Sequence, residues 1–224
     1  VAIMASGPTA DVAQLGLLLF ALRGPAAALQ SLTLFVVVRS FNPVLAAHGA
    51  LGGTLGWALP LAVSVRLLPM ATTQSLRLLT PLWLFGVVAA LCSVVGSPAL
   101  SVSLMKVATL VIIPSGIVIG CQRLTIAETQ ATGTWLWTLA IVVAALSLGT
   151  LVRPGIAHLP NSTLLNGILN QSQALGSFVA PFAAASLVQW LLARRTATPL
   201  RLAIWGAIVA CTLLTLSRTA AIAS

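Results

Sequence analysis

Three arginines, Arg39, Arg153 and Arg218, each follow a long apolar run and are the side chains best suited to binding an anion. A guanidinium presents a planar fork of N–H donors that matches the oxygens of a phosphate group. The chain carries 11 Lys and Arg residues against two Asp and Glu residues, so these arginines have almost no carboxylate to pair with. We therefore predict a site for a pyrophosphate-bearing ligand. The alternative is snorkelling, in which each guanidinium simply reaches water at a membrane surface.

Polar side chains near these arginines could complete such a site. Asn166, Asn170 and Gln173 have the spacing of one helical face, where they would line a polar cavity or form hydrogen bonds between helices. Ser217 lies next to Arg218 and adds a hydroxyl. His158 has the chemistry of a general base near neutral pH, although a solvated loop histidine without a role is more common.

The composition predicts a membrane protein. Hydrophobic residues make up 59% of the 224 residues and charged residues only 6%, against about 25% charged in soluble domains. Such a chain cannot cover a water-facing surface. We expect an all-α, polytopic transmembrane bundle forming a single domain over residues 1–224. Apolar runs long enough to span a bilayer predict about eight helices. They cover residues 1–22, 26–46, 48–68, 77–97, 99–121, 131–152, 164–192 and 200–218.

The basic residues predict the orientation of these helices. Cytoplasmic connections are enriched in Lys and Arg. The densest basic cluster follows the seventh predicted span, and alternation of the spans then places seven arginines on the cytoplasmic side. These are Arg23, Arg66, Arg77, Arg123, Arg194, Arg195 and Arg201. Arg39, Arg153 and Arg218 fall on the opposite side. The basic residues do not gather into a patch with interleaved aromatics, so we expect no nucleic-acid partner.

Metal and cofactor chemistry is disfavoured by the residue types present. The two acids, Asp11 and Glu128, are far apart in the sequence, and we expect Glu128 to form a surface pair with Arg123 in a loop. The three cysteines form no C-x-x-C pair and are expected to be small buried hydrophobes. We therefore predict no metal and no cofactor.

Two short motifs, in order, carry a resemblance to a known family. Residues 165–176 read Leu-Asn-Gly-Ile-Leu-Asn-Gln-Ser-Gln-Ala-Leu-Gly, and residues 216–220 read Leu-Ser-Arg-Thr-Ala after a further span. This part of the chain, residues 153–220, resembles the O-antigen ligase and O-antigen polymerase-like family of bacterial membrane glycosyltransferases. Thr219 stands where the family more often has glycine.

The resemblance implies a function in the assembly of surface polysaccharide such as lipopolysaccharide. Members of the family lie in the bacterial inner (cytoplasmic) membrane and transfer a glycan from undecaprenyl-pyrophosphate to a glycan or lipid acceptor. It assigns pyrophosphate binding to Arg218 and, more loosely, to Arg153. It assigns no catalytic base, since His158 does not match the family's loop histidine. We therefore expect the N-terminal portion of a longer enzyme that works without metal.

A different class of protein explains the same residues. The arginines and the polar stripe could line the path of a membrane transporter or anion permeation protein. A scaffold subunit of a membrane complex is a third interpretation. A large polar loop after Arg218 would favour the enzyme, whereas an inverted repeat of these spans would favour the transporter.

Overall fold

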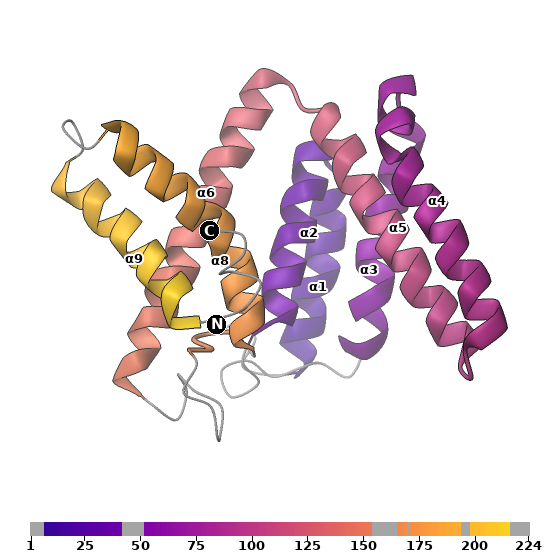
Figure 1. Ribbon diagram of the computed structural model, residues 1–224, viewed down its shortest axis with the longest axis horizontal. Helices are drawn as coiled ribbons and strands as arrows, with labels where there is room; N and C mark the ends of the chain where they lie inside the picture. Colours follow the sequence, from indigo (N-terminus) through magenta and orange to yellow (C-terminus); the bar gives the residue numbers. More distant parts are fainter. Residues whose placement is uncertain (1–6, 42–51, 154–164, 170, 194–197, 216–224) are drawn as a thin grey trace. The chain divides into compact units, whose positions relative to one another are not determined.

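The computed structural model describes residues 7–41, 52–153, 165–169, 171–193 and 198–215, and these residues are almost entirely helical (Figure 1). Their only β-type pairing is an isolated bridge between Phe41 and Leu169. The prediction of an all-α fold is confirmed. The α-helices are α1 (Gly7–Ala21), α2 (Pro25–Arg39), α3 (Gly52–Leu67), α4 (Thr73–Gly96), α5 (Leu100–Gln122), α6 (Ile126–Gly149), α8 (Ser172–Ala193) and α9 (Pro199–Thr215). Short 3-10 turns, η2 (Leu68–Met70) and η3 (Thr150–Val152), follow α3 and α6.

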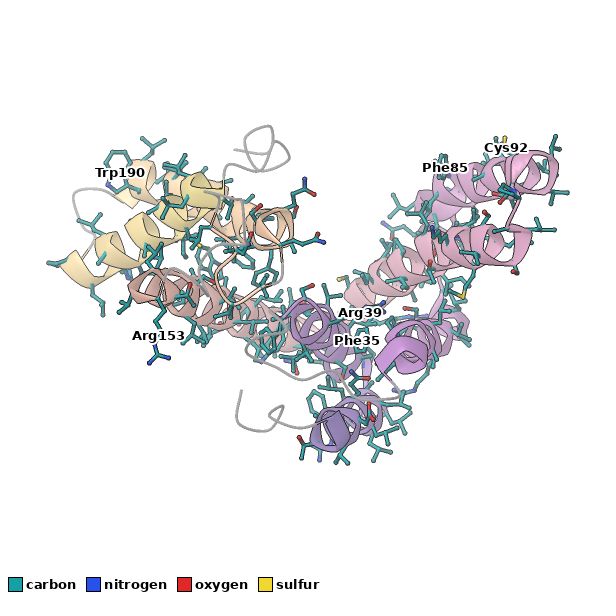
Figure 2. All side chains as sticks on the ribbon, turned by 90° about the horizontal axis from the view of Figure 1, so that it is seen from below. Phe35, Arg39, Phe85, Cys92, Arg153 and Trp190 are labelled. Atoms are coloured by element: carbon teal, nitrogen blue, oxygen red, sulfur yellow. The ribbon has the colours of Figure 1, made fainter. Side chains whose placement is uncertain are left out.

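Four of the described helices are long and apolar enough to cross a membrane. They are Thr73–Gly96, Leu100–Gln122, Ile126–Val152 and Ser172–Leu192. Only 11% of the most apolar stretch of α4 is buried inside the protein, and Figure 2 shows Phe85 and Cys92 on its outer side. Apolar side chains exposed along a whole helix are stable against lipid rather than water. The other described helices have 15 to 17 residues, so the expected count of about eight spans remains a prediction.

The helices divide into two compact units. The first, the α1–α5 unit, contains α1, α2 as far as Val36, α3, α4, α5 and the start of α6. Its core is formed by Ala21, Ala28, Leu32, Phe35, Leu59, Val63 and Leu67. In this unit α5 packs against both α3 and α4. The approach of α3 and α5 is close because Gly116 lies directly against Ser64.

The second unit, the α6–α9 unit, contains the end of α2, α6 from Gly133 onward, α8 and α9. The helices α8 and α9 lie side by side as a hairpin pair (Figure 1). The buried core of the unit comprises Val37, Val143, Ala144, Leu165, Ile168, Leu169, Leu175, Val179, Ala183, Ile208 and Cys211. The core includes Leu165, Ile168 and Leu169, which belong to none of the helices.

Two helices begin earlier than hydropathy predicted, and helix capping is the reason. The side chain of Thr72 accepts a hydrogen bond from Ser75 N, and the Ser75 hydroxyl accepts one from Thr72 N, which forms a capping box at the start of α4. Thr125 and Glu128 make the same reciprocal contacts at the start of α6. Glu128 is therefore in the first turn of a helix rather than in a loop, which corrects its expected placement.

Candidate functional site

The short segment 165–169 connects the ends of three helices in the α6–α9 unit. Leu165 N donates to Leu214 O in the last turn of α9 at 3.2 Å. Ile168 N donates to Ser147 Oγ near the end of α6 at 3.4 Å. Leu169 forms the antiparallel bridge with Phe41, two residues after the end of α2. The C-terminal ends of α2, α6 and α9 therefore meet around one segment.

A tight turn gives this segment its shape. Leu169 N donates to Asn166 O at 3.1 Å, and Gly167 has a φ of 60°, which lies in the left-handed region that favours glycine. A Cβ at residue 167 would lie 2.9 Å from the Cα atom of Ser147. Glycine is thus required at this position by both its backbone angle and the space available.

The helix ends gathered by segment 165–169 are those that carry the predicted anion-binding arginines. Arg39 is the last residue of α2, and Arg153 follows η3 directly after α6. Arg218 comes three residues after the end of α9, outside the described residues. The tertiary structure thus brings together the ends of the helices that carry Arg39 and Arg153, whereas the two side chains themselves lie well apart (Figure 2).

The described arginines at this end are accessible. Arg39 and Arg153 are both exposed, and Figure 2 shows the side chain of Arg153 extending away from the end of its helix. Both acids of the chain, Asp11 and Glu128, belong to the α1–α5 unit. The sequence of the α6–α9 unit thus contains arginines at these helix ends and no Asp or Glu.

The polar stripe predicted along the seventh span is corrected by the structure. The helix α8 begins at Ser172, so Asn166 lies in the preceding turn and does not share a helical face with Gln173. The turn at Gly167 interrupts the helix that was expected over residues 164–192. Asn166 is buried, whereas Gln173 is exposed in the first turn of α8. The predicted residues Asn170, His158 and Ser217 lie outside the described residues, as does Arg218.

Sequence reasoning missed Gly167 and Ser147 as the residues that hold the site together. A signal for the turn was present, because Asn166-Gly167 is one of the dipeptides typical of tight turns. No pattern in the sequence pointed to Ser147, whose contact with residue 168 spans 21 positions.

Arg66 and Arg123, which the sequence analysis used only to orient the helices in the membrane, form hydrogen bonds in the α1–α5 unit. The guanidinium of Arg66 donates to Ala21 O and, at 2.6 Å, to Leu22 O at the end of α1. Arg123 Nε donates to Met70 O at 2.7 Å. Both groups satisfy carbonyls that a helix end leaves without an intrahelical partner. The expected pair of Arg123 with Glu128 is replaced by these contacts, since Glu128 binds Thr125.

We expect Arg66→Gln to destabilise the protein by about 1 to 3 kcal/mol, because two carbonyls at the end of α1 lose a charged donor. The measurement is the midpoint of SDS-induced unfolding in mixed micelles. Arg77→Gln is the matched control, since Arg77 is exposed on α4 and its loss should change the free energy by less than about 0.5 kcal/mol. Equal midpoints for the two variants would contradict the capping role.

Four long apolar helices with outward-facing hydrophobic side chains define a helical membrane protein. Comparison of the chain with protein-family models, with curated proteins and with solved structures found no match.

Proposed function

We propose that this chain is part of a membrane glycosyltransferase similar to the O-antigen ligases and polymerases. It would transfer a glycan from undecaprenyl-pyrophosphate to a glycan or lipid acceptor in the bacterial inner membrane. One observation supports the proposal above the others: segment 165–169, which lies within the family-like motif, gathers the helix ends that bear Arg39 and Arg153 and lead to Arg218.

The chemistry required of these residues is electrostatic. The acceptor hydroxyl attacks the anomeric carbon of the donor glycan, and the bond from that carbon to the pyrophosphate oxygen breaks. The leaving pyrophosphate takes the electron pair, so negative charge grows on it in the transition state. Guanidinium groups at these helix ends stabilise this charge by electrostatic attraction and bidentate hydrogen bonding. A base accepts the hydroxyl proton, and His158 remains a candidate for that role.

The first test is the rate of glycan transfer by the full-length protein from a polyprenyl-pyrophosphate-linked donor in proteoliposomes. Arg153→Ala, Arg39→Ala and Arg218→Ala should each lower kcat/KM by roughly tenfold to a hundredfold, as expected for loss of a charge-assisted hydrogen bond. Arg153→Lys should retain part of the rate, because an ammonium keeps the charge but loses the bidentate fork.

The control is Arg77→Ala, an exposed arginine of the α1–α5 unit, which should leave the rate unchanged. Rates for the three arginine variants equal to that of the control would refute the proposed site. Arginine-dependent release of phosphate from loaded vesicles without any glycan transfer would instead identify an anion transporter.

A further inference from the structure

A cavity between α8 and α9 belongs to no part of the proposed transfer site. Its volume is about 310 Å³, which is at the lower end for small-molecule sites. Trp190 and Ser186 line it from α8, and Trp205 and Gly206 line it from α9. Trp190 is exposed at the outer edge of the helix pair (Figure 2), so the cavity opens toward the surroundings of the protein. Its walls are almost entirely apolar, which suits a hydrocarbon chain.

One polar group in this apolar wall has no partner. Ser186 is fully buried, and its hydroxyl makes no hydrogen bond with any part of the chain that the structure describes. Hydroxyl groups in apolar helices normally donate to the carbonyl four residues earlier, as Thr212 does to Ile208 O and Ser93 does to Ala89 O. A buried hydroxyl without a partner destabilises the folded state, because it has lost its hydrogen bonds to water. An occupant with a hydrogen-bonding oxygen would remove this cost.

Positive charge lies in the first turn of α9, next in sequence to Leu202, which lines the cavity. Arg201 is exposed in the first turn of α9, four residues before Trp205 and therefore on the same helical face. Side chains on a helix lean toward its N-terminus, so Arg201 is directed toward the membrane surface. The N-terminal end of α9 adds the partial positive charge of the helix dipole. The sequence of this unit contains no Asp or Glu, so an anionic headgroup would meet no repelling carboxylate side chain from it.

We propose that this cavity binds an anionic phospholipid with ester-linked acyl chains, from the leaflet next to the α8–α9 connection. One acyl chain packs against Trp190 and Trp205, an ester oxygen accepts a hydrogen bond from Ser186 Oγ, and the headgroup phosphate pairs with Arg201. This inference requires only a membrane protein and does not depend on glycan transfer.

The structure offers a substitution that should fill the cavity without disturbing the fold. A Cβ placed on Gly206 meets no atom within 4 Å, so Gly206→Leu can extend into the space that the lipid would occupy. Gly133→Leu is the matched control, because Gly133 of α6 also has no atom within 4 Å of an added Cβ and does not line the cavity. Circular dichroism should show equal helix content for both variants.

The experiment is native mass spectrometry of the delipidated full-length protein, titrated with phosphatidylglycerol or phosphatidylcholine of identical acyl chains. The wild type and Gly133→Leu should bind one phosphatidylglycerol at least tenfold more tightly than phosphatidylcholine. Gly206→Leu should lose this binding, and Arg201→Gln should keep one lipid but lose the headgroup preference. Ser186→Ala should bind ester-linked and ether-linked phosphatidylglycerol equally, whereas the wild type prefers the ester.

Three results would overturn the proposal. Equal affinity of the wild type for the two headgroups would remove the role of Arg201. Undiminished phosphatidylglycerol binding by Gly206→Leu would place the lipid elsewhere. Dissociation of a dimer by Gly206→Leu, without loss of lipid, would show that a second copy of the chain fills the cavity.

Discussion

Gly167→Ala is expected to destabilise the protein by about 3 kcal/mol or more and, because it disrupts the fold of the candidate site, to abolish the proposed glycan transfer. Alanine at a φ of 60° costs about 1 to 2 kcal/mol. Its Cβ would also lie 2.9 Å from the Cα atom of Ser147, a backbone atom that cannot move without shifting α6. Overpacking of this kind adds roughly 1 to 3 kcal/mol.

The measurement is the free energy of unfolding from SDS titration, with transfer activity followed in parallel. Gly149→Ala is the control, because a Cβ at residue 149 meets no atom within 4 Å and alanine favours helix, so its stability should be unchanged or slightly higher. Gly167→Asn separates the two causes. Asparagine tolerates a positive φ but still carries a Cβ, so it should remain strongly destabilised. Near-normal stability of Gly167→Asn would show that the backbone angle alone requires glycine here.

The second large effect is expected at the contact between α3 and α5. A Cβ on Gly116 would lie 2.7 Å from Ser64 Cβ and 2.8 Å from Ser64 Cα. Gly116→Ala should therefore push the two helices apart and lower the free energy of unfolding by about 2 to 3 kcal/mol. Bulkier residues should be worse, because van der Waals contact between closely packed small residues is the main attraction between helices in a membrane.

A double-mutant cycle with Ser64→Gly tests this explanation directly. The second substitution removes the Ser64 Cβ and hydroxyl but leaves its Cα in place, so we expect partial and not complete rescue of Gly116→Ala. Gly96→Ala, at a position with no atom within 4 Å, controls for the helix propensity of alanine. Additive effects of the two substitutions would mean that the contact does not carry the destabilisation.

Hydropathy predicted the positions of the long helices well, but it predicted the residues at which they begin poorly. The cores of α4, α5 and α6 lie where apolar runs predicted them, because a bilayer requires long apolar segments with internally satisfied backbone groups. The first turns of α4 and α6 were missed, since the capping boxes at Thr72 and Thr125 are made of polar residues that lower the local hydropathy. The span expected over residues 164–192 is interrupted by the turn at Gly167. Hydropathy did not indicate this turn, because the residues around it are apolar.

The candidate site was predictable in its residue types but not in its assembly. The excess of arginine over acids is visible in the sequence, and it predicted an anion as the ligand. The sequence alone did not show that residues 165–169 are a buried connector. Asn166 was accordingly assigned to a helical face, although the structure buries it in a turn.

By itself the sequence determined an all-helical chain suited to a membrane. Composition and hydropathy suffice for this, because the free energy of moving a side chain from water to lipid depends mainly on its residue type. Only the tertiary structure decided that the ends of α2, α6 and α9 meet around segment 165–169. That arrangement depends on contacts between residues far apart in the chain, such as Ser147 with Ile168 and Leu165 with Leu214. The arrangement of these helix ends requires glycine at residue 167, where there is no room for a Cβ, and the hydroxyl of Ser147, which accepts a hydrogen bond from Ile168 N. Hydropathy indicates neither requirement.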